Sequence, residues 1–275
     1  MDFLNFVFIN MKIENVALLI PIHPPHYQFV YDLLNKLKAN DIHIDIHLVF
    51  SKQADCDKFA MKNEIHPIIC TPFYTFSVVT HKKFFGLKHL CNSKYDYIIC
   101  CDSEIDIICD NFTNENIHSK IHQIFDNKKI YCGEIGTKIM EKSAELFPEK
   151  YEYLKNITQN FTLYSWWSDL PVYRRADIKP FLDMIKCDNM VWEHFDHIIY
   201  QYYLILYHNF EIVNTTPITN LQWSLEKLST NDSNVLNGLQ NINYGFSWSN
   251  KKFYDLNTTF VESQKGFLIY NLDRK

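Results

Sequence analysis

The sequence is poor in the residues and patterns that mark several common classes of protein. It has only 6 Gly and 9 Pro in 275 residues and no tract rich in Gly, Ser or Pro, which excludes a collagen-like repeat or a flexible linker. Its 8 cysteines include no C-x-x-C pair, so neither a zinc knuckle nor a disulfide framework is indicated. No run reaches the 18 apolar residues typical of a membrane span. We therefore expect no transmembrane segment and a cytoplasmic protein.

Positive charge is also scarce. The chain has 27 Lys and Arg against 32 Asp and Glu, and its basic residues cluster only in pairs such as Lys82-Lys83. Because proteins that bind a phosphate backbone concentrate Lys and Arg on one surface, we expect no nucleic-acid partner. Hydrophobic residues (47%) and aromatic residues (16%) are plentiful instead. They suffice for a large core and for a cleft whose rings face sugars or bases.

The first part of the chain alternates between strand and helix patterns. Residues 15–22 read NVALLIPI, a continuous apolar run typical of a buried parallel strand, and residues 27–39 follow with helical spacing. Further strands are predicted at 41–50, 65–70, 95–101 and 129–132, and further helices at 58–63, 78–90, 114–125, 177–185 and 193–207, with a last strand at 266–270. This order predicts an α/β fold, a mostly parallel, doubly wound, Rossmann-type sheet flanked by helices, in a single domain of residues 1–275.

Three carboxylates, Asp102, Glu104 and Asp106, follow the predicted strand at 95–101 directly. In open parallel sheets, ligands bind beyond the carboxyl ends of the strands, where the strand order reverses. Neighbouring carboxylates repel one another unless a positive charge lies among them, and Mg²⁺ or Mn²⁺ is the simplest such charge. Which pair would bind the metal stays open. The alternative is that Asp102 caps a turn and that Glu104 and Asp106 face solvent.

The segment 82–108, a helix and then a hydrophobic strand that ends in Asp102-Ser103-Glu104, resembles the central part of the GT-A glycosyltransferases. In that superfamily the strand ends in a D-x-D motif, and here Glu104 takes the second acidic place. The opening NVALLIPIHPP resembles the first strand and turn of these enzymes, which hold the nucleotide. The resemblance covers about residues 13–135. It implies a metal-dependent enzyme that transfers a sugar from a nucleotide diphosphate donor to a glycan acceptor.

The resemblance also implies roles for particular residues of the first half, which would bind the nucleotide sugar. Asp102, Glu104 and Asp106 would hold Mn²⁺ or Mg²⁺. The expected contacts to the nucleotide lie in the turns after the first strand and after the acidic strand, and on the helix between them: Pro21, His23, His26, Lys83, Asp102 and Ser103.

The second half, about residues 136–275, would bind the acceptor. An inverting enzyme needs a carboxylate base near the acceptor hydroxyl, and the segment WEHFDH offers Glu193 and Asp196. Acidic residues also open helices for electrostatic reasons alone, which is the alternative for both. Segment 164–175 contains aromatic rings, a carboxylate and a cation that could bind the acceptor through sugar faces, hydroxyls or a phosphate: Trp166, Trp167, Asp169, Tyr173 and Arg174. The alternative is a packed aromatic cluster with exposed cations.

Two other functions remain open. A nucleotidyltransferase of similar fold would share the metal, but such enzymes usually carry a Gly-rich basic loop after the first strand, where this chain has Pro-Ile-His-Pro-Pro. A non-catalytic sugar- or protein-binding module would keep the fold without turnover. Metal-dependent hydrolysis of the donor would separate an enzyme from such a module.

Overall fold

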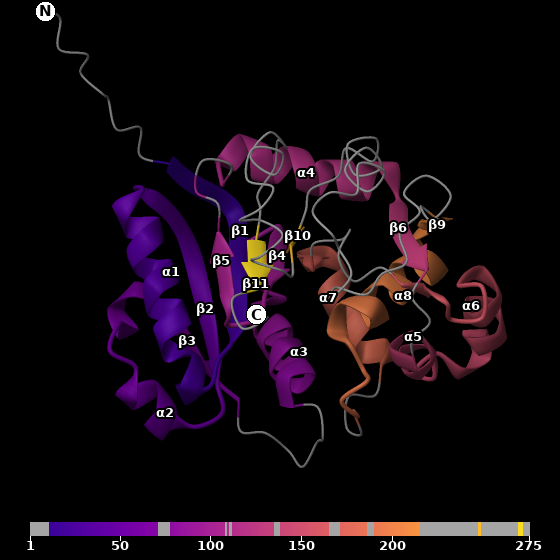
Figure 1. Cartoon of the computed structure of the whole chain (residues 1–275), viewed down its shortest axis with the longest axis horizontal. Helices are drawn as coiled ribbons and strands as arrows, with labels where there is room; N and C mark the ends of the chain where they lie inside the picture. Colours follow the sequence, from indigo (N-terminus) through magenta and orange to yellow (C-terminus); the bar gives the residue numbers. More distant parts are fainter. Residues whose placement is uncertain are drawn as a thin grey trace, which may run out of the picture.

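The computed structural model describes residues 11–70, 78–107, 109, 112–134, 138–164, 171–185, 190–214, 247–248 and 269–271. Strands and helices alternate through the first hundred of these residues, and a sheet with helices on both sides results (Figure 1). The predicted fold class is confirmed.

The main sheet has five strands in the order β3-β2-β1-β4-β8. The first four are parallel, and β8 runs antiparallel to β4. Their bounds are β1 Met11–Pro21, β2 Ile42–Phe50, β3 His66–Ile69, β4 Tyr97–Cys100 and β8 Val172–Arg174. Strand β1 lies in the centre, and its residues 16–21 are buried, as the unbroken apolar run predicts. The strand begins earlier than predicted, because a bulge at Asn15, with φ 57°, lets Met11 and Lys12 pair with β2 as well.

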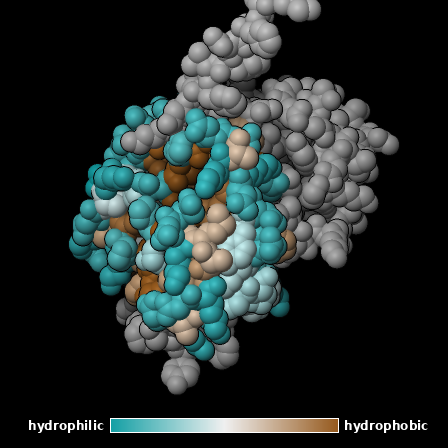
Figure 2. Space-filling view, turned by 90° about the vertical axis from the view of Figure 1, so that its left-hand side faces the viewer, coloured by the Kyte–Doolittle hydropathy of each residue, from teal (hydrophilic) through white to brown (hydrophobic). Residues whose placement is uncertain are grey.

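Helices α1 (Tyr27–Ala39) and α3 (Val78–Leu90) cover opposite faces of this sheet, to its left and right in Figure 1. Helix α1 buries Val30, Leu33, Leu34 and Leu37 at helical spacing. Its polar side belongs to the largely hydrophilic face in Figure 2, where apolar residues show only in patches. Helix α3 approaches β1 and β2 closely at Gly86, where an added Cβ would lie 2.6 Å from Leu19 Cδ1.

The later elements build two small sheets and a helical layer. Strand β5 (Ile105–Ile107) pairs with β11 (Ile269–Asn271), which pairs with β10 (Ser247–Trp248); β6 (Lys129–Glu134) lies between β7 (Leu163–Tyr164) and β9 (Glu211–Asn214). The helices are α4 Asn114–Asn127, α5 Lys138–Ala144, α6 Tyr151–Ile157, α7 Arg175–Met184 and α8 Asp196–His208. Helix α4 begins at a Thr113 side chain that accepts a hydrogen bond from the Asn116 amide.

Some predicted boundaries were wrong. The helix expected at 58–63 lies earlier, as α2 (Gln53–Lys58), because Phe59 leaves the helix with extended backbone and packs against Tyr27, Tyr31 and Phe50. Helix α8 begins at Asp196 rather than at 193. Strand β5 and helices α5 and α6 were not predicted. Among the described residues, no helix has the length and apolar character needed to cross a membrane.

Candidate functional site

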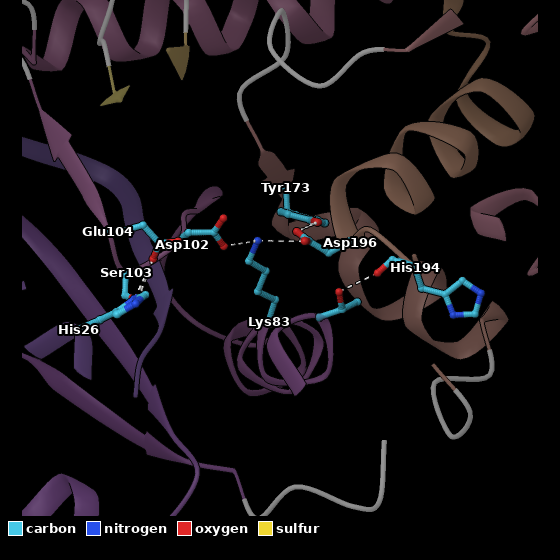
Figure 3. A network of polar contacts seen from close by, with 9 residues as sticks. His26, Lys83, Asp102, Ser103, Glu104, Tyr173, His194 and Asp196 are labelled. Carbon is cyan, nitrogen blue, oxygen red and sulfur yellow. Dashed lines mark hydrogen bonds and ion pairs between the residues drawn. The ribbon is translucent and has the colours of Figure 1, made fainter. Parts of the chain in front are cut away.

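The candidate site lies where β1 and β4 end side by side. The chain leaves β1 toward β2 and returns from β3 to β4, so the strand order reverses between these two neighbours. Parallel sheets bind their ligands at such a point. His23 and His26 follow β1, Asp102, Ser103 and Glu104 follow β4, and the structure brings these two turns into contact (Figure 3).

A buried lysine forms the first part of the site. Lys83 of α3 is only 6% exposed, and its Nζ lies 2.9 Å from Asp102 Oδ1 and 3.0 Å from Asp196 Oδ1. The hydroxyl of Tyr173 donates to the other oxygen of Asp196 at 2.8 Å. Burial alone would lower the pKa of Lys83, but the two carboxylates raise it well above its ordinary value. Lys83 is therefore charged and joins the turn after β4 to the start of α8.

Asp196, one of the two residues predicted as a base, is the buried end of this network. It is 2% exposed, and its two oxygens accept from Lys83 and Tyr173. A carboxylate that is held in this way positions Lys83 rather than meeting an acceptor hydroxyl. Tyr173 is itself fully buried, so its ring is not on a surface that an acceptor could reach. Glu193 lies in the turn that precedes α8 and is partly exposed.

A histidine with a carboxylate forms the second part. His26 Nδ1 lies 2.7 Å from Ser103 Oγ and 3.0 Å from Glu104 Oε2, and Ser103 Oγ donates to the same carboxylate at 3.1 Å. The ring of His23 packs on that of His26, with centroids 3.9 Å apart. Figure 3 shows this group beside Asp102, on the opposite side from Lys83.

The three predicted metal ligands do not form one ligand set. Asp102 pairs with Lys83 and Glu104 with His26, whereas Asp106 lies on β5, where Lys36 of α1 binds it at 2.7 Å. Within the part of the chain that the structure describes, no three His, Cys, Asp or Glu side chains are placed to hold a metal ion. Lys83 and Lys36 thus place positive charge beside Asp102 and Asp106 and reduce the repulsion that called for a metal. The residues do not fit a metal held by this triplet, and the requirement for Mn²⁺ or Mg²⁺ stays a prediction.

Arg174 does not lie at the site either. It belongs to β8, where it pairs with Tyr97 at the amino end of β4, the edge opposite to Asp102. Its guanidinium binds both oxygens of the buried Asp177, at 3.0 and 2.9 Å, and thereby fixes the start of α7. A contact of Arg174 with an acceptor stays a prediction. Trp166, Trp167 and Asp169 lie outside the described residues, and Pro21 closes β1 in the core.

Sequence reasoning missed the burial of the Lys82-Lys83 pair. Lys82 is 3% exposed, and its Nζ donates to the carbonyl oxygen of Ile22, beyond the end of β1, at 2.6 Å. Burial lowers its pKa. The sequence spacing indicates this burial, because Lys82 and Lys83 precede Gly86 and Leu87 by four residues and so lie on the side of α3 that packs on the sheet.

Comparisons with known proteins give little. No protein-family model matches the chain, and no curated protein does. Among solved structures it is similar to one described as CMP:2-keto-3-deoxy-manno-octonic acid synthetase complexed with CTP. The TM-score is 0.35 and the identity 10%, over 72% of this chain and 88% of that chain. A likeness this weak supports no conclusion about function, which therefore depends on the site.

Proposed function

We propose that this protein is a glycosyltransferase that moves a sugar from a nucleotide diphosphate donor to a hydroxyl of a glycan acceptor. The observation that carries the proposal is the meeting of acidic, histidine and lysine side chains at the point where the strand order of a parallel sheet reverses. Phosphate-bearing ligands commonly bind there, and sugar chemistry uses carboxylates and positive charge together.

The charges at this edge suit such a donor. Asp102, whose side chain is 33% exposed, and Glu104 are acceptors for the hydroxyls of a ribose or a sugar. Lys82 is positively charged, and its Nζ donates a hydrogen bond to a carbonyl oxygen rather than to a carboxylate. In a poorly solvated place such a charge acts strongly on nearby anions, so it favours the developing charge of a leaving diphosphate.

Thermal stabilisation by nucleotides is the first test. The purified protein is measured with a panel of nucleotide sugars and nucleoside diphosphates, with and without Mn²⁺, alongside Asp102→Ala and the control Asp183→Ala. Asp183 is a surface carboxylate of α7, bound to Lys179 one turn away. We expect one nucleotide family to raise the melting temperature of the wild type and of Asp183→Ala but not of Asp102→Ala. A wild type that no nucleotide stabilises would contradict the proposal.

Product analysis then identifies the reaction. A glycosyltransferase releases a nucleoside diphosphate from the donor when an acceptor is present. A nucleotidyltransferase would release pyrophosphate from a nucleoside triphosphate and a sugar, and that product would replace our assignment. Binding without any product would identify a non-catalytic module.

A further inference from the structure

His26 is held through one ring nitrogen only. Its Nδ1 contacts Ser103 Oγ and Glu104 Oε2, at 2.7 and 3.0 Å. Its Nε2 makes no hydrogen bond within the described part of the chain, and a fifth of the side chain stays exposed. The ring is thus fixed at the carboxyl edge of the sheet, and Nε2, the nitrogen that does not contact Glu104, is the one left to meet a ligand.

Counting hydrogens assigns the tautomer. Ser103 Oγ lies 2.7 Å from His26 Nδ1 and 3.1 Å from Glu104 Oε2, and its single hydroxyl hydrogen can serve only one of these contacts. An ionised Glu104 can only accept a hydrogen bond. If Nδ1 carried no hydrogen, its lone pair would face the carboxylate oxygen at 3.0 Å, which is repulsive. Nδ1 therefore carries a hydrogen, and in the neutral form of the ring Nε2 presents a lone pair.

We propose that His26 is the general base of the reaction and that Glu104 and Ser103 position its ring. The inference rests on the proposed transfer. Asp196, one of the two bases predicted from the sequence, has both oxygens bound in the core, whereas the side chain of His26 is 20% exposed at the same edge of the sheet. A carboxylate on Nδ1 fixes the ring and stabilises the imidazolium that forms when Nε2 takes a proton.

The hydroxyl oxygen of the acceptor forms a bond to the anomeric carbon of the donor sugar. The bond from that carbon to the diphosphate breaks, and the diphosphate leaves with the bonding pair. The hydroxyl proton passes to Nε2 of His26 and from there to solvent.

The tautomer is tested without any substrate, by long-range proton–nitrogen correlation spectra of ¹⁵N-labelled protein above pH 7. We expect the Nδ1–H form for His26. His118 is an internal reference with the opposite form, because its Nε2 lies 2.7 Å from the carbonyl oxygen of Glu14, which can only accept. In Glu104→Ala, Ser103 is released to donate to Nδ1, so the spectrum of His26 should change to the Nε2–H form. An Nε2–H form in the wild type would overturn the inference whatever the reaction is.

The catalytic role is tested with His26→Ala and the control His43→Ala, an exposed histidine whose partner is Asp41. We expect His26→Ala to lower turnover by roughly 10²- to 10⁴-fold. Stabilisation by the donor nucleotide should be kept, and added imidazole should restore part of the turnover. Unchanged turnover, or a loss that imidazole does not restore, would overturn the role of His26. A wild type without transfer activity would overturn the proposed function instead, and the tautomer would still be decided by the spectra.

Discussion

Replacing Lys83 by Met tests the buried network most directly. The substitution keeps the length of the side chain and removes its charge, which leaves Asp196, only 2% exposed, without its cation. Breaking a buried ion pair from one side costs about 3–5 kcal/mol, because an uncompensated charge stays in the core. For a chain of this size that corresponds to a fall in melting temperature of roughly 6–20 °C.

The measurement is chemical denaturation at neutral pH, with Lys179→Met as the matched control. Lys179 pairs with Asp183 on the surface of α7, where both side chains are mostly exposed. Solvent screens such an exposed pair, so its loss should change the stability little. The double variant Lys83→Met/Asp196→Asn should regain part of the lost stability, since the buried negative charge is removed as well. If Lys83→Met loses no more than Lys179→Met, the network is not buried as described and the reasoning fails.

Two further predictions concern stability. Burial, with the neighbouring His66, lowers the pKa of His47 from 6.5 to about 4, so the unfolded chain binds a proton there that the folded chain does not. The free energy of unfolding should therefore fall as pH drops from 6.5 toward 4, and His47 should account for up to about 3 kcal/mol of that fall. In chemical denaturation, the free energy of unfolding of His47→Gln should depend less steeply on pH than that of the wild type. An equally steep pH dependence would contradict this prediction. Gly86→Ala should destabilise the protein by about 1–3 kcal/mol, against the gain usual for Ala in a helix, because its Cβ would lie within 2.9 Å of Leu19 and Val49. In thermal unfolding, Leu19→Val added to Gly86→Ala should recover part of that loss, since it removes the closest methyl groups. A Gly86→Ala variant at least as stable as the wild type would refute the close packing.

The sequence by itself determined the α/β class, the order of the first strands and helices, and the place of the acidic residues after β4. These properties depend on local periodicity and on turn residues. The run NVALLIPI can only be buried, and the spacing of Val30, Leu33, Leu34 and Leu37 has the period of a helix. Because parallel strands end at one edge, the sequence also located the candidate site at the turns that hold His26 and Asp102.

Only the tertiary structure decided which partner each charged side chain has. Lys83 and Asp196 are 113 residues apart, and His26 and Ser103 are 77 apart. No local pattern encodes such contacts. Three carboxylates within five residues suggested a shared metal, whereas in the folded chain Asp106 pairs with Lys36 of α1, and Asp102 pairs with Lys83 of α3, which also binds Asp196. The physical reason is that the spacing of apolar residues determines which face of a helix or strand is buried, whereas the packing of whole helices and strands determines which side chains meet there.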